Sequence, residues 1–421
     1  MNVDVAAPSL SRAATGACRV CGGALHPFVD LGVSPLCESF LTCEQLDAGE
    51  MFYPLDVKVC GTCYLAQLAE YVAPEKIFDD YAYFSSFSQA WLAHAREYVA
   101  AMVERFALGA QSFVVEIASN DGYLLKNVVA RGIPCLGIEP AHTVATAALA
   151  GGTPTRMAFF GRALAEEMAA AGQCADLVVG NNVLAQVPNL NDFTAGLRIL
   201  LKPEGVITLE FPHLARLIAG NQFDTIYHEH FSYFSLAAIE ALLARHALRV
   251  FDVEELWTHG GSLRVFACRA EAAHLEQPSV GRLRIAEAAA GLKDLATYTA
   301  FGANVEQLKH ALLTLLIECR QRGARVAGYG APGKGNTLLN FCGIRTDLLA
   351  FTVDRNPYKW GRFLPGTRIP VRPPEAIEAE RPDYVLILPW NLREEIMQQL
   401  APIRAWGGRF IVPIPWPDVV A

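Results

Sequence analysis

Four cysteines in the N-terminal part of the chain have the spacing of a metal site. Residues 18–21 read C-R-V-C and residues 60–63 read C-G-T-C. Each pair presents two thiolates at a separation that suits tetrahedral Zn²⁺, and four thiolates leave no coordination position open for catalysis. Cys37 and Cys43 lie between the pairs but lack the paired spacing. The sequence therefore predicts a structural zinc ion held by Cys18, Cys21, Cys60 and Cys63.

A second group of reactive side chains lies in residues 225–234, T-I-Y-H-E-H-F-S-Y-F. Histidine is the usual general base near neutral pH, and a neighbouring hydroxyl or acid can orient it or stabilise an oxyanion. If the segment is extended, His228 and His230 share one face and Glu229 takes the other. Two alternatives are a zinc pair, for which no third ligand is visible nearby, and a hydrogen-bonded core cluster.

The elements that must position these groups begin with a nucleoside-binding pattern. Residues 112–125, S-F-V-V-E-I-A-S-N-D-G-Y-L-L, predict a buried strand, a tight turn and a helix start whose free N–H groups permit close approach of a ligand. The next strand, residues 134–139, ends in Glu139, about 20 residues after Glu116, a separation that places an acid beside a ribose.

Further elements extend this pattern into a sheet. A strand from Asp176 is followed by a helix over 197–201, a turn over 202–205 and a strand over 206–210. The alternation predicts a parallel sheet with its ligand at the carboxyl edge. Flanking elements are predicted as a helix over 89–106, a hairpin over 251–266 and a linking helix over 305–319. The His259-Gly-Gly turn of this hairpin could face the site, although a plain hairpin turn is the favoured interpretation.

A glycine-rich turn marks the last part of the chain. Residues 325–337 read R-V-A-G-Y-G-A-P-G-K-G-N-T, in which Gly328, Gly330 and Gly333 fit G-x-G-x-x-G. Alone, this motif suggests an NAD-dependent oxidoreductase, but a glycine turn at a helix N-terminus can bind any pyrophosphate. The run D-R-N-P-Y-K at 354–359 adds two cations, which either contact phosphates or are solvated.

Composition limits the class of protein. The 421 residues carry a net charge of −8 and no basic cluster, which opposes nucleic-acid binding. The N-terminus lacks a signal-peptide pattern and no apolar run is long enough to span a bilayer, so we expect no membrane partner. Eleven cysteines in a chain without a signal peptide or a membrane span are more typical of thiols and metal ligands than of disulfides, which indicates a cytoplasmic location. The sequence is compatible with a monomer and does not define the oligomeric state.

The chain resembles the S-adenosylmethionine-dependent methyltransferases, because E-I-A-S-N-D-G-Y is similar to the first motif, E-I-G-S-N-D-G, of one narrower group. That group is the sugar C-methyltransferases of deoxysugar biosynthesis. Four features occur in the same order over nearly the whole chain: the thiolate pairs, E-I-A-S-N-D-G-Y, Y-H-E-H and G-Y-G-A-P-G-K-G-N-T.

The resemblance implies an α/β fold: a Rossmann-like methyltransferase sheet between an N-terminal zinc-binding module and a C-terminal Rossmann-like domain. We place these at residues 1–75, 76–310 and 311–421, with the nucleotide-linked sugar bound by the last. The implied reaction transfers the methyl group of S-adenosylmethionine to the carbon next to the ketone of a TDP-linked keto-deoxysugar, through an enolate. A sugar carbon becomes nucleophilic only when a base removes the proton beside such a ketone.

The resemblance also implies roles for individual residues. His230 is the base, Tyr227 and Glu229 belong to the same site, and His228 is structural. Tyr81 carries a hydroxyl that could reach the site. Related enzymes commonly carry histidine where Gln186 stands, and glutamine cannot take a proton at neutral pH. The cofactor-binding residues are Glu116, Ala118, Asn120, Gly122, Tyr123, Leu124, Glu139, Pro140, Asn181 and Asn182, and the substrate-binding residues are Gln186, Gly330, Lys334, Gly335, Asn336, Asp354, Arg355 and Lys359.

Three other functions remain open from the sequence. A nicotinamide-dependent sugar-nucleotide oxidoreductase accounts for the glycine turn but not for the second nucleoside pattern at Glu116–Glu139. A nucleic-acid-binding zinc ribbon accounts for the cysteines but not for the acidic charge. An O- or N-methyltransferase would share the cofactor site and would need no enolate.

Overall fold

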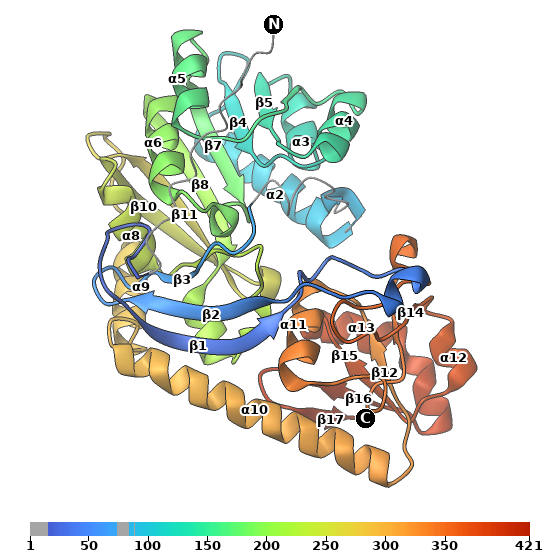
Figure 1. Cartoon of the computed structure of the whole chain (residues 1–421). Helices are drawn as coiled ribbons and strands as arrows, with labels where there is room; N and C mark the ends of the chain where they lie inside the picture. The colour runs from blue at the N-terminus through green and yellow to red at the C-terminus, as the bar shows by residue number, and fades with distance from the viewer. Residues whose placement is uncertain (1–15, 74–83, 88) are drawn as a thin grey trace, which may run out of the picture.

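The computed structural model describes residues 16–73, 84–87 and 89–421. Tyr81 therefore lies outside the described residues. Three β-sheets follow one another along the chain, and a long helix runs beneath the first toward the last (Figure 1).

The first sheet has four antiparallel strands in the order β1-β2-β3-β9. In β2, Leu55, Val57 and Val59 are buried and alternate with more exposed polar residues, as expected for a sheet with one covered face. The fourth strand comes from a segment far along the chain. The strands are β1 (Leu25–Ser34), β2 (Tyr53–Cys60), β3 (Ala66–Leu68) and β9 (Ser232–Tyr233).

The second sheet has seven strands in the order β10-β11-β8-β7-β4-β5-β6. The five strands from β8 to β6 are parallel, and a hairpin of β10 and β11 closes one edge in antiparallel register. Continuous apolar runs form the central strands because helices cover both faces. The strands are β4 (Val114–Ile117), β5 (Cys135–Ile138), β6 (Thr155–Arg156), β7 (Ala175–Asn181), β8 (Leu201–Pro212), β10 (Leu248–Leu256) and β11 (Ser262–Arg269).

Helices surround this sheet on both faces (Figure 1). The predicted helix over 89–106 is confirmed as α2. The predicted turn over 202–205 is wrong: β8 already pairs at Leu201 and takes up these residues as an irregularity before Val206. The helices are α2 (Gln89–Arg105), α3 (Leu125–Val129), α4 (His142–Ala150), α5 (Arg162–Ala170), α6 (Leu190–Leu200), α7 (Leu214–Ala219), α8 (Leu236–Ala244) and α9 (Pro278–Ala289).

The third sheet has six strands in the order β14-β13-β12-β15-β16-β17, all parallel except β17. The glycine-rich turn follows β12 and leads into α11. The strands are β12 (Val326–Tyr329), β13 (Thr352–Val353), β14 (Val371–Arg372), β15 (Tyr384–Ile387), β16 (Arg409–Val412) and β17 (Asp418–Val420), and the helices are α11 (Gly333–Cys342), α12 (Ala376–Glu380) and α13 (Arg393–Gln399).

Helix α10 (Leu295–Gln321) joins the second sheet to the third and lies along β1 (Figure 1). The ring of Phe28 in β1 contacts Tyr298 and Phe301 at centroid distances of 5.2 and 5.0 Å. One hydrophobic core contains residues of the first sheet, α10 and the third sheet together. This shared core fixes the glycine turn relative to the zinc module. The domain limits at 75 and 310 stay predictions, and the second falls within α10.

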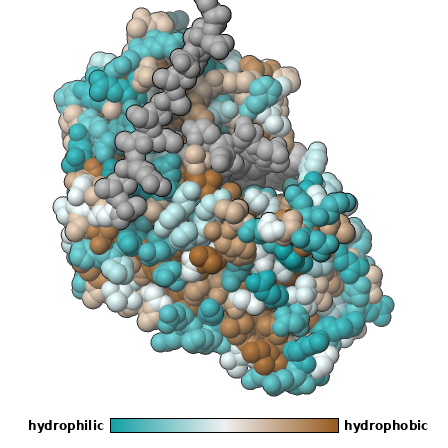
Figure 2. Space-filling view, in the orientation of Figure 1, coloured by the Kyte–Doolittle hydropathy of each residue, from teal (hydrophilic) through white to brown (hydrophobic). Residues whose placement is uncertain are grey.

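The described surface has no large continuous apolar face in the view of Figure 2, where apolar residues form small groups among polar ones. Within residues 16–73, 84–87 and 89–421, no helix has both the length and the apolar character needed to cross a membrane.

A buried carboxylate ties three elements around the second sheet together. Glu287 in α9 accepts a hydrogen bond from His213 Nε2 at 2.8 Å and from the backbone N–H groups of Leu236 and Ala237 at 2.6 and 3.1 Å. It therefore satisfies donors at the start of α8 that would otherwise lack a partner.

We expect Glu287→Ala to lower the free energy of unfolding by about 3 kcal/mol, because it leaves His213 and two N–H groups buried without their acceptor. Urea denaturation would measure this loss. The matched control is Glu318→Ala, which removes an exposed pair with Arg322 and should cost less than about 0.5 kcal/mol. Equal effects of the two changes would contradict the prediction.

Candidate active site

One cavity of about 710 Å³ lies where the three sheets meet. The loop after β1 contributes Cys37 and Glu38, the loop after β5 of the second sheet contributes Glu139, the turn before β9 contributes His230, and the start of α11 contributes Lys334. Residues from all parts of the chain thus converge on one cleft, which is of the size that holds small-molecule ligands.

The four predicted zinc ligands lie together at one end of the first sheet. All four Sγ atoms are within 4.8 Å of one another, and Sγ–Sγ distances are 3.5 Å for Cys18–Cys63 and 3.4 Å for Cys21–Cys60. A tetrahedral ion with Zn–S bonds of about 2.3 Å requires sulfur separations of about 3.8 Å, so small shifts would complete the site. Among the described residues, these four form the one cluster suited to a metal ion. The residues fit a structural zinc ion.

The turn after β4 forms the nucleoside end of the cavity. Glu139 accepts hydrogen bonds from the N–H groups of Asn120 and Ala141, both at 2.9 Å, and these fix its carboxylate at the cavity wall. Ala118, Asn120 and Asn182 have φ values of 56°, 50° and 55°, a conformation that non-glycine residues seldom adopt. Such backbone strain is typical of a turn shaped around a ligand.

Unpaired polar atoms at this end fit S-adenosylmethionine. Asn181 ends β7, is only 8% exposed, and both of its side-chain amide atoms lack a hydrogen-bond partner among the described residues. A buried amide of this kind is normally satisfied, so it indicates a polar ligand. Trp91 of α2 stacks on Tyr123 at 5.9 Å and 26°, which adds an aromatic wall suited to an adenosine group.

Most of the predicted cofactor residues line the cavity. Glu116, Gly122 and Leu124 do not; Glu116 is buried beneath the turn, and burial raises its pKa well above the ordinary value. Those on the cavity wall are Ala118, Asn120, Tyr123, Glu139, Pro140, Asn181 and Asn182.

Residues Tyr227–His230 form a tight turn rather than an extended strand, since the His230 N–H donates to the Tyr227 carbonyl at 2.9 Å. The alternation assumed for an extended segment does not apply, and Tyr227, Glu229 and His230 all line the cavity. His228 instead points to the first sheet and contacts the carbonyls of Tyr53 and Pro54 at 3.3 and 3.2 Å. Its position supports the structural role that we expected.

The environment of His230 leaves one ring nitrogen for chemistry. Its Nδ1 lies 3.2 Å from the Thr225 carbonyl, and because a carbonyl only accepts, Nδ1 must carry the proton. Nε2 therefore has a free lone pair. Burial lowers the pKa of His230 to about 4, with smaller contributions from His259 and Lys334, so the imidazole is neutral at physiological pH. The ring of Tyr227 lies against it at 4.2 Å.

Glu229 contacts the zinc module directly. The thiol of Cys37 donates to Glu229 Oε1 at 3.5 Å. The pKa of Glu229 is raised to about 7, mainly by burial and also by the nearby Glu38, while the Cys37 hydrogen bond and Lys359 partly oppose the rise. The carboxyl group therefore titrates near neutrality and can exist as either acid or base under working conditions.

The glycine turn forms the opposite end of the cavity. Lys334 donates to Asn391 Oδ1 at 2.9 Å and its ammonium lies 4.6 Å from the Trp390 ring. Gly330 has φ 88°, and a Cβ atom there would lie 2.6 Å from Pro389, so only glycine permits this turn. Gly335 and Asn336 are buried behind the turn and do not line the cavity.

The charged run after β13 has mixed roles. Asp354 accepts from the N–H groups of Ala331 and Asn356, and Lys359 donates to the Ala331 carbonyl at 2.8 Å, so both hold the glycine turn. Arg355 has a largely exposed side chain that reaches Glu395 at 3.4 Å. All three also line the cavity, as does Gln186.

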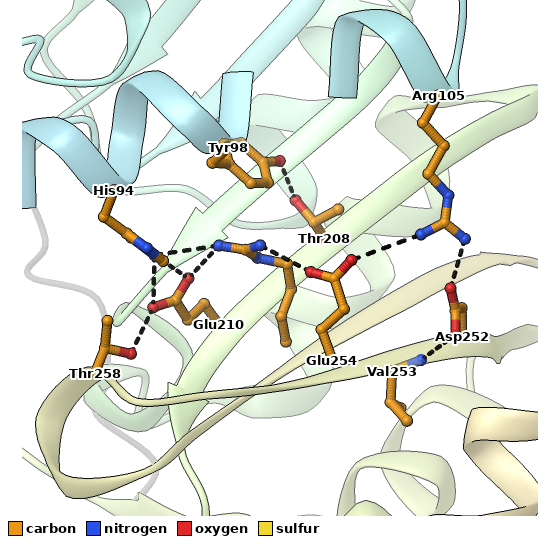
Figure 3. A network of polar contacts seen from close by, with 10 residues as sticks. His94, Tyr98, Arg105, Thr208, Glu210, Asp252, Val253, Glu254 and Thr258 are labelled. Carbon is orange, nitrogen blue, oxygen red and sulfur yellow. Dashed lines mark hydrogen bonds and ion pairs between the residues drawn. The ribbon is translucent and has the colours of Figure 1, made fainter. Parts of the chain in front are cut away.

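A buried ionic network links α2, β8 and the β10–β11 hairpin (Figure 3). Glu210 at the end of β8 accepts from Arg264 at 2.7 Å, from Thr258 at 3.0 Å, and lies 3.0 Å from His94 Nε2. Burial alone would raise the pKa of Glu210, but the His94 hydrogen bond and the Arg264 charge outweigh it and bring the pKa to about 2. The network joins α2 to the β10–β11 hairpin.

Several cavity residues were missed from the sequence. Cys37 and Glu38 have no motif around them, and Trp91 belongs to an ordinary amphipathic helix. His259, for which the sequence favoured a plain turn over one that faces the site, lines the cavity. The signal that supports the site-facing alternative is the H-G-G triplet, since two glycines beside a histidine indicate an unusual backbone.

Family models match three successive parts of the chain. One described as a zinc binding domain matches residues 18–78, one described as a methyltransferase domain matches residues 91–253, and one described as a C-methyltransferase C-terminal domain matches residues 257–415. C-methyltransferase NovU from Streptomyces niveus is 38% identical over 408 residues, which are 96% of either chain. The chain belongs to the C-methyltransferase family. It is an S-adenosylmethionine-dependent enzyme, and the three-part α/β architecture expected from the resemblance is confirmed.

Solved structures are similar over part of the chain. A methyltransferase from Mesorhizobium loti has 14% identity and a TM-score of 0.34, covering 42% of this chain and 100% of that one. Magnesium protoporphyrin IX methyltransferase from Synechocystis PCC 6803, with bound SAH, has 14% identity and a TM-score of 0.34, covering 46% of this chain and 91% of that one.

The zinc site can be tested by metal content. Cys60→Ser should reduce bound zinc from about one ion per chain to nearly none, because a structural site needs all four ligands. Cys43→Ser, an exposed cysteine outside the cluster, is the matched control and should retain zinc. Mass spectrometry of the metal would measure both, and full zinc in Cys60→Ser would disprove this ligand set.

The Glu210 network predicts a pH-dependent stability. Because the pKa of Glu210 is lowered from 4.5 to about 2 in the folded state, its contribution is present above pH 4.5 and is lost as the pH falls toward 2. The shift corresponds to on the order of 3 kcal/mol.

Glu210→Gln should therefore be less stable than wild type at pH 7, and the difference should shrink on acidification. Urea denaturation between pH 7 and pH 3 would measure this convergence. Glu254→Gln, which changes the partly exposed carboxylate on the other side of Arg264, should show a smaller difference. A difference for Glu210→Gln that does not vary with pH would contradict the prediction.

Proposed function

We propose that this C-methyltransferase acts on the carbon next to the ketone of a TDP-linked keto-deoxysugar, and that His230 forms the enolate that accepts the methyl group. The observation that carries the proposal is the shared cavity. The nucleoside end near Glu139 and Asn181 and the glycine turn near Lys334 open onto the same space, with His230 also on its wall.

The two ends suit two different ligands. Glu139 after β5 offers a fixed carboxylate and Asn181 at the end of β7 an unpaired amide, which suit the ribose and polar groups of S-adenosylmethionine. The glycine turn precedes the N-terminus of α11, where free N–H groups and Lys334 suit a diphosphate. A sugar joined to that diphosphate would extend toward His230.

The chemistry follows from the protonation of His230. The C–H bond beside the ketone breaks, its proton passes to Nε2, and its electron pair forms the carbon–carbon double bond as the carbonyl electrons move to oxygen. S-adenosylmethionine supplies an electrophilic methyl group, whose bond to sulfur breaks as the new carbon–carbon bond forms and the ketone is restored. A neutral imidazole with its other nitrogen held by Thr225 is suited to the first step.

Two further residues on the wall suit the sugar. Glu229, with a pKa of about 7, can hold a sugar hydroxyl as an acceptor or share its proton. Gln186 offers both a donor and an acceptor without acid–base function. Tyr81 stays a prediction because it lies outside the described residues.

The test is exchange of solvent deuterium into a panel of TDP-linked keto-deoxysugars, with S-adenosylhomocysteine present or absent. Wild type should exchange the proton beside the ketone, and His230→Asn should reduce the rate by about 10²-fold or more. His228→Asn is the matched control and should retain exchange, since His228 does not line the cavity.

Two other results of the exchange experiment would contradict different parts of the proposal. Exchange that persists in His230→Asn would move the base's role to Glu229 or a tyrosine. No exchange by wild type with any keto-sugar, in either cofactor condition, would disprove enolate formation on this class of substrate.

A further inference from the structure

We propose that His259 is a second catalytic histidine, which binds the ketone oxygen of the substrate and donates a hydrogen bond to it as the enolate forms. This inference rests on the proposed function, because it assigns a group to the oxygen of the same enolate. His259 belongs to the turn between β10 and β11, more than 25 positions along the chain from His230.

The backbone around His259 is held in an unusual conformation. His259 has φ 55° and ψ 20°, and the glycines after it have φ 90° and 119°. Left-handed backbone is uncommon for residues other than glycine, although histidine adopts it more often than most, and such conformations cluster at functional sites.

The residues beside His259 hold the turn by hydrogen bonds. Thr258 donates to Glu210 at 3.0 Å, within the network of Figure 3. Gln222 donates to the Gly260 carbonyl at 2.9 Å, and the His213 N–H donates to the Gly261 carbonyl at 3.0 Å. These hydrogen bonds hold the backbone on both sides of His259, so the imidazole is positioned without a hydrogen bond of its own.

The imidazole itself lacks such a partner. Its Nδ1 is buried with no hydrogen bond to any described residue, and the ring contacts Trp91 edge-on at 5.4 Å. The ring lines the same cavity as His230 and Lys334. A buried imidazole with unused hydrogen-bonding capacity, on the wall of a ligand cavity, indicates a polar ligand atom.

The ketone oxygen is the atom that this position suits. Enolate formation needs a donor placed in advance at the oxygen where negative charge develops. His230 cannot serve both carbon and oxygen, because its Nδ1 proton is held by Thr225. Trp91, which His259 touches, also stacks on Tyr123 of the nucleoside end, so His259 lies next to the cofactor end of the cavity.

The protonation state of His259 agrees with this role. The pKa of His259 is lowered to about 4, mainly by burial and also by the positive charge of Lys334, against the opposing effect of Glu210. A neutral imidazole can donate one hydrogen bond to an enolate oxygen, as in other enzymes that use neutral histidine as an electrophile.

The test compares His259→Asn and His259→Gly in the deuterium exchange assay, with the TDP-linked keto-deoxysugar that wild type exchanges. Both replacements tolerate left-handed backbone, so the turn should keep its shape. The exchange rate should fall about 10²- to 10³-fold. The KM for the sugar nucleotide and the Kd for S-adenosylmethionine should stay within about 3-fold of wild type, since the change removes an interaction that strengthens only as the enolate forms.

A rescue experiment separates chemistry from structure. Added imidazole should restore exchange by His259→Gly at least about 10-fold, because it can occupy the space of the missing ring. His274→Asn, a distant surface histidine, is the matched control and should show neither loss nor response to imidazole.

Other outcomes overturn the inference. Exchange at the wild-type rate in both variants would show that His259 does not bind the ketone oxygen, while the base assignment of His230 stands. Normal exchange with weakened binding of S-adenosylmethionine would show that His259 binds the cofactor and not the ketone oxygen. Failure of wild type itself to exchange would disprove the proposed function, which is a different result from failure of the variants alone.

Discussion

The active-site segment depends on a short antiparallel ladder that joins it to the zinc module. Ser232 and Tyr233 pair with Gln67 and Ala66, and the Leu68 N–H donates to the Phe231 carbonyl at 3.0 Å. The second cysteine pair, Cys60 and Cys63, ends β2 and directly precedes β3. A zinc ion that fixes this knuckle therefore also fixes β3, and through β3 the residues that follow His230. The zinc module therefore helps to position the candidate site, although its four thiolates leave no position for substrate.

The zinc module also contacts two other parts of the cavity, the H-E-H turn and the glycine turn. Cys37 touches Glu229, and a Cβ atom on Gly333 would lie 2.9 Å from the Cys37 sulfur, so the loop after β1 fits closely between the H-E-H turn and the glycine turn. Helix α10 packs against β1, and both belong to a hydrophobic core that also includes the third sheet. Because protein interiors are close-packed, movement of any one sheet would have to displace the others. The cavity therefore requires the three sheets as one assembly.

Local sequence patterns predicted those parts of the site that a few adjacent residues specify. The thiolate pairs, the strand–turn–helix around Asn120 and the glycine turn are each encoded within short segments, and each has the expected structure. The contributions of Cys37 and His259 arise from contacts between distant segments, such as the 192 positions that separate Cys37 from Glu229. The alternation of side chains expected for an extended segment was wrong at Tyr227–His230, because these residues form a turn. A strand pattern is reliable only where a neighbouring strand is present, and here the ladder begins after His230.

The charge distribution of the cavity is consistent with two neutral imidazoles around a developing anion. Lys334 is held by Asn391 and by the face of Trp390, and the indole N–H of Trp390 in turn donates to Asp224 at 2.7 Å. The Lys334 ammonium and the buried Asp224 carboxylate attract one another. In the free enzyme the Lys334 charge helps to lower the pKa of both histidines. A diphosphate bound beside Lys334 would offset that charge and raise the pKa of His230, which would make the imidazole a stronger base when the substrate is present.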